Sequence, residues 1–202
     1  EKAKSEGVAQ FIFMSSMIVY GDSSAIDVPF VITTDTLPSP ANFYGDSKLQ
    51  AEKGLLALAD PSFCVTILRP PMIYGKSSKG NFPLLVSLAK KTPVFPNIQN
   101  QRSMLYINNL CEFIRLVIDL KKKGILFPQN AEYVSTAELV KKVSSMNQHK
   151  IWFTKLFNPV LRIASKRMVM LKKVFGNFVY EKEMSVYPDM PYQICDWQQS
   201  LQ

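Results

Sequence analysis

Two side chains spaced four residues apart have the chemistry of a general base and its activator. Tyr44 and Lys48 lie in the segment 43–59, which has the apolar periodicity of a helix. Residues i and i+4 share one face of a helix, so both side chains can point into one pocket. A phenol is a poor base at neutral pH, but a neighbouring ammonium stabilises the phenolate. We therefore predict that Tyr44 acts as a general base with Lys48 as its electrostatic partner.

A serine hydroxyl is predicted to join this pair from a neighbouring strand. Ser16 follows the run 8–14, whose almost continuous apolar character is typical of a strand buried on both faces of a parallel sheet. Ligands of open α/β sheets bind at the carboxyl ends of the strands. Ser16 is thus placed to exchange a hydrogen bond with a substrate hydroxyl. A second buried run, 63–68, ends at Arg69-Pro70-Pro71.

Strand and helix patterns alternate along the chain, which indicates an α/β fold with a parallel sheet. Residues 1–7 resemble the end of a helix, 21–42 an ordered loop, and the chain becomes helical and basic from about residue 150. Further helices are predicted at 82–91, 108–122 and 136–147, and further strands at 93–95, 104–107, 125–127 and 132–134.

The 202 residues carry 24 Lys and Arg against 16 Asp and Glu, a formal charge of +8. This excess is compatible with nucleic acid, anionic lipid or phosphorylated small molecules, but no nucleic-acid recognition motif is present, so we expect no nucleic-acid partner. Cys64, Cys111 and Cys195 are far apart and His149 is the lone histidine. We therefore expect reduced thiols, no metal site and a cytoplasmic location.

Three motifs together resemble the extended short-chain dehydrogenase/reductases, in particular the NAD-dependent epimerase/dehydratase family. They are FIFMSSMIVYG at 11–21, FYGDSKLQAE at 43–52 and LRPPMIYG at 68–75, and the resemblance extends over about residues 8 to 120. It implies a partial Rossmann-type parallel sheet with a smaller mixed α/β substrate-binding lobe. Residues 1–75 would be the carboxyl-terminal part of the NAD-binding domain and 76–202 mainly the substrate lobe, with 104–135 returning to the Rossmann sheet.

The resemblance also implies roles for single residues. Ser16, Tyr44 and Lys48 match the catalytic residues of the family. Lys48 would also hold the nicotinamide ribose, and Pro71 would lie beside the nicotinamide. With Ser15 and Tyr44 these two complete the expected contacts to the cofactor, which is NAD, with NADP left open.

On the substrate side, the resemblance implies a nucleotide-diphosphate sugar. Asn81-Phe82-Pro83 resembles the stretch that covers the diphosphate and base, and Pro93-Val94-Phe95 resembles the strand beside the base. Arg102 matches the arginine that clamps the diphosphate, a task for which its planar, always charged fork is suited. The expected substrate contacts are Ser16, Asn81, Phe82, Val94, Phe95 and Arg102.

Some residues differ from the pattern of the family, and these differences reduce the number of reactions that we expect. Met17 and Ile18 stand where dehydratases carry an acid pair, and the cysteine of 3,5-epimerases is absent as well. Hydride transfer at one carbon remains, so the expected activity is that of a nucleotide-sugar 4-epimerase or a 4-keto reductase. Met72 replaces the asparagine usual in galactose-type 4-epimerases. The alternative is a non-catalytic dinucleotide-sensing or scaffold relative, but the retention of Tyr44 and Lys48 favours an enzyme.

Eight glycines are few for this length, and none of them forms the GxxGxxG turn by which the family binds its dinucleotide. We therefore expect a truncated chain that binds NAD poorly alone and does not turn over nucleotide sugars. The resemblance also implies a homodimer that packs through the 43–59 helix, although the leucines of this helix fit a core equally well. The basic segment 151–174 is compatible with a helix at a membrane interface, but we favour ordinary helices with basic outer faces.

Overall fold

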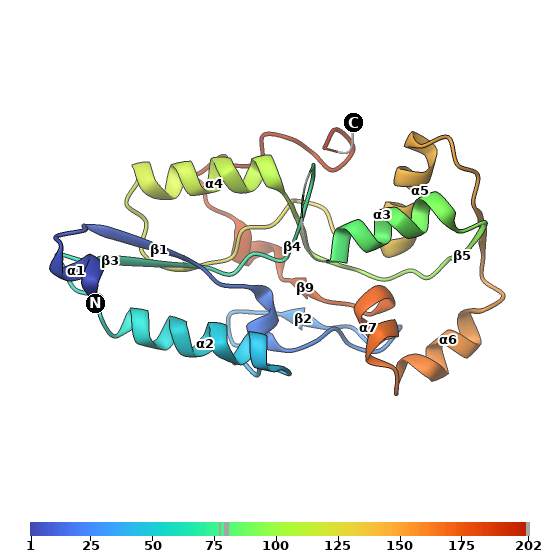
Figure 1. The fold of residues 1–202 in the computed structure, drawn as a ribbon, viewed down its shortest axis with the longest axis horizontal. Coiled ribbons are helices and arrows are strands. Elements are labelled where there is room, and N and C mark those ends of the chain that lie inside the picture. Colours follow the sequence, from blue (N-terminus) through green and yellow to red (C-terminus); the bar gives the residue numbers. More distant parts are fainter. Residues whose placement is uncertain (77, 79–80, 201–202) are drawn as a thin grey trace.

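The computed structural model describes residues 1–76, 78 and 81–200. Three parallel strands form its central sheet in the order β1-β3-β7: β1 (Gln10–Met14), β3 (Cys64–Leu68) and β7 (Gly124–Leu126). Figure 1 shows helix α2 (Phe43–Leu56) on one face of this sheet and α4 (Ile107–Asp119) on the other. The α/β class with parallel, Rossmann-like strands is thereby confirmed.

Strand β1 packs apolar residues on both faces, as its continuous apolar sequence predicts, but all five of its residues are half-buried rather than fully buried. Phe11 and Phe13 pack with Ile67 in the cluster on the α2 side, where Leu55 also lies. The alternate residues Ile12 and Met14 pack with Leu68 against α4, through Phe113 and Val117. Successive residues of a strand point to opposite faces, so a strand between two helix layers needs apolar residues at every position.

The other half of the molecule combines short parallel strand pairs with four helices and has its own hydrophobic core. Two 3-10 helices, η1 (Met17–Tyr20) and η2 (Lys182–Ser185), and the short α1 (Lys2–Ser5) complete the described elements. The pairs are β4 (Met72–Tyr74) with β6 (Met104–Tyr106), β5 (Val94–Pro96) with β8 (Trp152–Thr154), and β2 (Val31–Ile32) with β9 (Val179–Tyr180); the helices are α3 (Asn81–Lys91), α5 (Thr136–Met146), α6 (Asn158–Ser165) and α7 (Val169–Phe175).

Several elements differ from those expected. The strand expected at 132–134 is reduced to an isolated bridge between Val134 and Arg102. The segment 152–154, expected to be helical, is strand β8, because Trp-Phe-Thr are aromatic and β-branched residues that favour strands. Within 104–135, β7 joins the central sheet whereas β6 pairs with β4 outside it.

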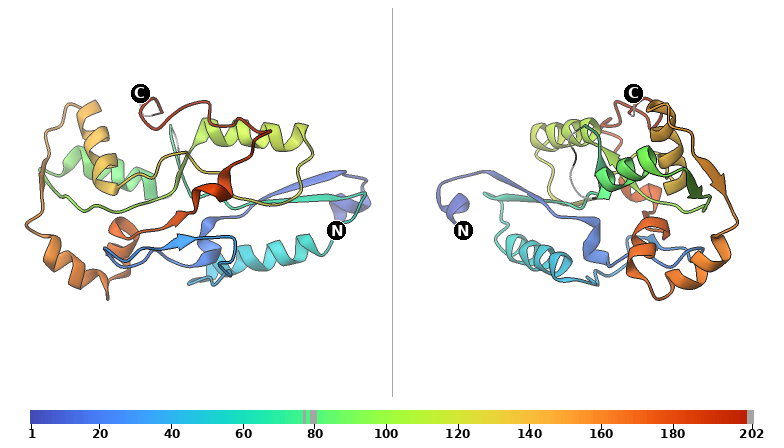
Figure 2. Two further views of the ribbon diagram at one scale, coloured as in Figure 1. Left: turned by 180° about the vertical axis from the view of Figure 1, so that it is seen from behind. Right: turned by 45° about the vertical axis from the view of Figure 1, so that its right-hand side comes forward.

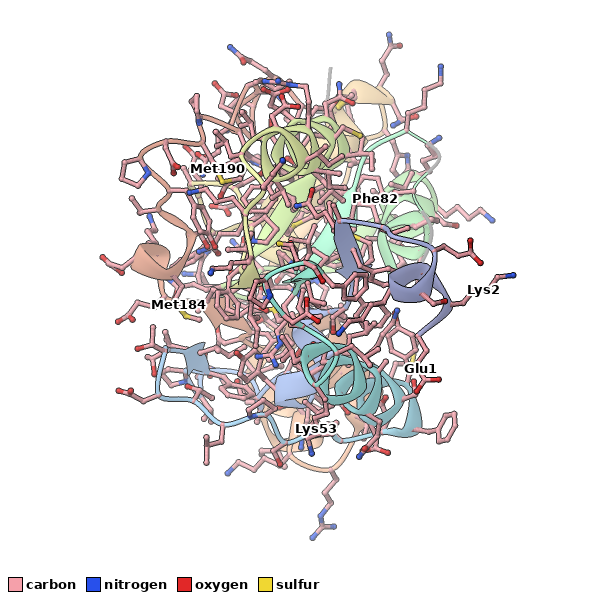
Figure 3. All side chains as sticks on the ribbon, turned by 90° about the vertical axis from the view of Figure 1, so that its left-hand side faces the viewer. Glu1, Lys2, Lys53, Phe82, Met184 and Met190 are labelled. Carbon is pink, nitrogen blue, oxygen red and sulfur yellow. The ribbon has the colours of Figure 1, made fainter. Side chains whose placement is uncertain are left out.

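Figure 2 shows from two further directions that α1 and α6 lie at opposite ends of an elongated molecule. Figure 3 looks from the α1 end, where Lys2 and Lys53 project outward, whereas Phe82 and Met190 lie in the interior. Of the α2 leucines, Leu55 packs into the cluster below the sheet and Leu56 is partly exposed. The carboxyl ends of β1 and β3 point toward the middle of the molecule, where the two halves meet.

Candidate active site

A cavity of about 380 Å³ lies where β1 and β3 end. Ser16, Tyr44, Pro71 and Arg102, four of the residues singled out from the sequence, line it together. Met72, noted in the sequence as the replacement for an asparagine, also lines it, and the wall further includes residues that were not predicted as contacts, among them Asp22, Ser23, Lys173 and Phe178. The cavity thus brings together groups from the sheet edge, from helix α2 and from the far end of the chain.

Backbone hydrogen bonds between two strand ends hold Ser16 in place. Ser15 donates its N–H to the carbonyl of Leu68 at 2.8 Å, and Met17 donates to the carbonyl of Pro70 at 3.0 Å. Ser16 caps η1, where its Oγ accepts a hydrogen bond from the N–H of Ile18 at 3.3 Å. This cap satisfies one of the free donors of the helix and orients the hydroxyl at the sheet edge.

Tyr44 lies in the first turn of α2. Asn42 caps this helix, because its side-chain Oδ1 accepts a hydrogen bond from the N–H of Gly45 at 2.9 Å. The phenol is 56 % exposed and faces the cavity. Gly45 lets α2 approach η1, because a Cβ at this position would lie 2.9 Å from the carbonyl oxygen of Ile18. A side chain there would push Tyr44 away from Ser16.

Lys48 lies behind Tyr44, one turn further along α2. Its Nζ donates to the carbonyl of Met14 at 2.8 Å and stands 5.8 Å from the centre of the Tyr44 ring and 4.8 Å from that of Phe13. An ammonium has three donors, so further N–H groups are free to bond a ligand hydroxyl. Lys48 with Tyr44 and Pro71 therefore fits the nicotinamide-ribose end of NAD, whereas no glycine-rich turn for the dinucleotide phosphates occurs in the sequence.

The third residue on this face of α2, Glu52, anchors the site from below. It is 1 % exposed and accepts hydrogen bonds from Ser15 Oγ and from Arg69, whose Nε and Nη2 lie 3.0 and 2.5 Å from its carboxylate. Arg69 also donates from Nη1 to Tyr20 Oη at 2.6 Å. The hydroxyl of Ser15, expected to contact the cofactor, is thus engaged in this buried network.

Opposing effects set the proton affinities within the network. Burial alone would lower the pKa of Arg69, but its hydrogen bonds to Glu52 hold that pKa above the usual value. Burial raises the pKa of Tyr20, against the opposing effect of Arg69. The guanidinium therefore stays charged, and the network holds the ends of β1 and β3 to α2.

Arg102 enters the cavity from the other half of the molecule. Its Nη1 donates to the carbonyls of Lys173 at 2.9 Å and Gly176 at 3.4 Å and to Ser23 Oγ at 3.3 Å. It forms no ion pair within the part of the chain that the structure describes. Burial lowers the pKa of Arg102 to about 10. A guanidinium held only by neutral acceptors suits an anionic ligand, and a diphosphate fits its fork.

Three of the predicted substrate contacts, and the cofactor contacts Ser15 and Lys48, are not among the residues that line this cavity. Phe82 is buried against Tyr74, with ring centres 5.7 Å apart, and Phe95 is buried against Phe175 at 5.6 Å. Val94 is half-buried on β5. The side chain of Asn81 lies outside the described residues. Lys173 was visible in the sequence only as one member of a basic cluster, and nothing in the pattern distinguished Asp22.

A parallel sheet with a Ser, a Tyr and a Lys at its carboxyl edge is the arrangement of a short-chain dehydrogenase/reductase. The model of the NAD dependent epimerase/dehydratase family matches residues 1–127, and the chain belongs to this family. The family that the three motifs predicted is thereby confirmed, and so is NAD as the cofactor of that family.

Two curated relatives and one solved structure illustrate the likeness. A UDP-glucose 4-epimerase of Vibrio cholerae is 37 % identical over 158 residues, which are 75 % of this chain and 48 % of the relative. An Escherichia coli O157:H7 4-epimerase of N-acetyl-glucosaminyl-diphospho-undecaprenol is 35 % identical over 120 residues, 54 % of this chain and 33 % of the relative. The chain therefore spans about half the length, or less, of these relatives. The UDP-glucuronic acid 4-epimerase of Bacillus cereus in complex with NAD shares the fold, with a TM-score of 0.69 at 17 % identity, covering 98 % of this chain and 61 % of that one.

Proposed function

We propose that this chain supplies the catalytic and diphosphate-binding groups of a nucleotide-sugar 4-epimerase. One observation carries the proposal: Tyr44, backed by Lys48, opens into the same cavity as Ser16 and as Arg102, which has no ion-pair partner among the described residues. The base and the anion site line the same cavity, as a sugar linked to a diphosphate requires. The names of the curated relatives support a 4-epimerase.

In the proposed reaction, Tyr44 as phenolate removes the proton from the sugar 4-hydroxyl. Ser16 donates a hydrogen bond to the same oxygen and steadies it while the C4 carbonyl forms. NAD, when bound, supplies hydride acceptance and return at C4. Tyr44 then gives its proton back to the same oxygen, so one residue serves both directions. Arg102 and Lys173 hold the diphosphate while the sugar turns its other face.

The groups beside Ser16 favour this chemistry over elimination. Met17 and Ile18 line the cavity next to the serine and cannot donate a proton to a leaving hydroxyl. A 4-keto reductase would use the same residues for half of the cycle. The two activities differ in whether the hydride returns to the same sugar.

The first test measures substrate binding to the chain itself. Calorimetric titration with UDP-glucose is expected to show binding that is lost in Arg102→Met and kept in the exposed control Arg115→Met. A well-folded wild-type chain that binds neither UDP-glucose nor UDP would contradict the diphosphate site.

The second test measures turnover. The chain is joined to the amino-terminal half of the Vibrio cholerae relative, which is 37 % identical to it over 158 residues. We expect NMR to show 4-epimerisation of UDP-sugars by the chimera, a loss of at least about a hundredfold in Tyr44→Phe, and no turnover by the chain alone. A chimera that binds NAD and UDP-glucose but turns over equally well with phenylalanine at position 44 would refute the assigned base.

A further inference from the structure

Helix α6 packs two polar residues and the half-buried Leu161 against the protein and leaves two apolar residues in solvent. The buried side carries Asn158, which donates to the carbonyl of Asn97 at 2.9 Å, and Ser165, which accepts from the N–H of Ile26 at 3.3 Å. On the opposite side Val160 is 69 % exposed and Ile163 is 72 % exposed. A surface helix ordinarily has the reverse orientation. The outer face favoured from the sequence as basic thus carries exposed apolar residues as well as exposed basic ones.

Exposed apolar side chains continue beyond α6 on both sides. Helix α7 packs beside α6, and both lie in the half of the molecule away from α1, with α6 nearer to its end (Figures 1 and 2). Scattered exposed apolar residues are normal, whereas a contiguous group marks an interaction site. We define the α6–α7 face as the exposed residues Leu156, Phe157, Val160, Ile163, Met168, Val169 and Met170.

The charge around this face has one sign. The segment 139–180 contains nine Lys and Arg and no Asp or Glu, whereas the rest of the chain has 15 Lys and Arg against 16 Asp and Glu. The whole positive excess of the protein therefore belongs to the segment that carries the face. Arg162 pairs with Asp27 at 2.5 Å, while Lys155, Lys166 and Arg167 are exposed beside the apolar residues.

We propose that the α6–α7 face docks on the surface of an anionic lipid bilayer. Apolar side chains with neighbouring Lys and Arg are the composition that inserts between headgroups and gains from negative lipids. No helix among the described residues is long and apolar enough to span a membrane. A second copy of the chain is a poorer occupant, because two such faces would bring unmatched positive charges together.

The docking face borders the active-site cavity. Met170 of the face and Lys173 line a smaller cavity of about 90 Å³ with Leu84 and Leu85, and Arg102 contributes to its wall. Membrane binding would therefore bring the proposed diphosphate site close to the lipid surface. Docking on a membrane is separate from the proposed reaction and does not depend on it.

Flotation with lipid vesicles tests the proposal on the full chain. We expect wild type to bind vesicles of equal parts phosphatidylglycerol and phosphatidylcholine at low salt, and to bind phosphatidylcholine alone at least about tenfold less. Two double variants, Val160→Ser with Ile163→Ser and Lys155→Glu with Lys166→Glu, should each lower the bound fraction about tenfold or more.

The matched control is Ile118→Ser with Leu120→Ser, which removes exposed apolar groups at the end of α4 and should leave binding unchanged. Circular dichroism checks that each variant keeps its fold. The proposal fails if wild type does not bind mixed vesicles, or if the control loses as much binding as the α6–α7 variants. It also fails if sedimentation shows a wild-type dimer that Val160→Ser with Ile163→Ser dissociates while vesicle binding is unaffected.

Discussion

Glu52 and Arg69 form a buried ion pair, with Nη2 and Oε2 2.5 Å apart, directly beneath the edge that carries Ser16 and Tyr44. Glu52 lies on the same face of α2 as Tyr44 and Lys48, two and one turns away. Arg69 follows β3 and leads into Pro71. The pair therefore fixes the distance between the base helix and the two strand ends, and its loss affects the site as a unit.

Glu52→Gln should destabilise the protein strongly, because it leaves the guanidinium of Arg69 buried without its counter-charge. The expected loss is about 3 kcal/mol in the free energy of unfolding, measured by urea unfolding followed by circular dichroism. The control is Glu112→Gln, which breaks an exposed pair with Arg115 on α4 and should leave the midpoint close to wild type. Equal effects of the two substitutions would contradict the structural role of the buried pair.

Two glycines of the same helix should respond to alanine in opposite directions. A Cβ on Gly45 meets the carbonyl oxygen of Ile18 at 2.9 Å, so Gly45→Ala should lower stability by about 1–3 kcal/mol. A Cβ on Gly54 meets nothing within 4 Å, so Gly54→Ala should raise it by up to about 1 kcal/mol. Thermal unfolding of both variants provides the measurement. A neutral Gly45→Ala would show that η1 can move away from α2 freely.

The two substitutions at Arg102 separate charge from geometry. Arg102→Lys keeps the positive charge but loses the planar fork, so it should weaken UDP binding by about 1.5–3 kcal/mol, and Arg102→Met should weaken it more. Calorimetry on the folded variants measures both. Equal affinity of the lysine variant and wild type would mean that Arg102 acts as a point charge only.

Stability should fall in alkali because of a buried tyrosine. Burial raises the pKa of Tyr74 from its ordinary 10.0 to about 12. The unfolded chain thus loses this proton more readily than the folded protein. The contribution of Tyr74 to the free energy of unfolding is therefore complete below pH 10 and is lost as the pH rises toward about 12. Urea midpoints measured across this range should fall less steeply in Tyr74→Phe. The same slope in both proteins would exclude Tyr74 as a cause.

The parts of the site that could be predicted are those determined by local patterns. An uninterrupted apolar run places Ser16 at a strand end, and a four-residue spacing places Tyr44 and Lys48 on one helix face. Lys173 and Phe178 join the cavity through the chain's path in three dimensions, for which local sequence has no signal. Likewise, the periodicity of α6 shows two faces but not which is buried, because Asn158 and Ser165 find hydrogen-bond partners in distant loops.

Phe178 exchanges backbone hydrogen bonds with Gln101 and Ser103, and the neighbouring strand β9 pairs with β2. One wall of the cavity is therefore formed by residues from the first fifth of the chain, and another wall is formed by residues from the last fifth. On a ribosome, β1, α2 and β3 can assemble long before residue 178 has been translated. The part of the cavity wall that Lys173 and Phe178 form is thus added only after most of the chain has been translated.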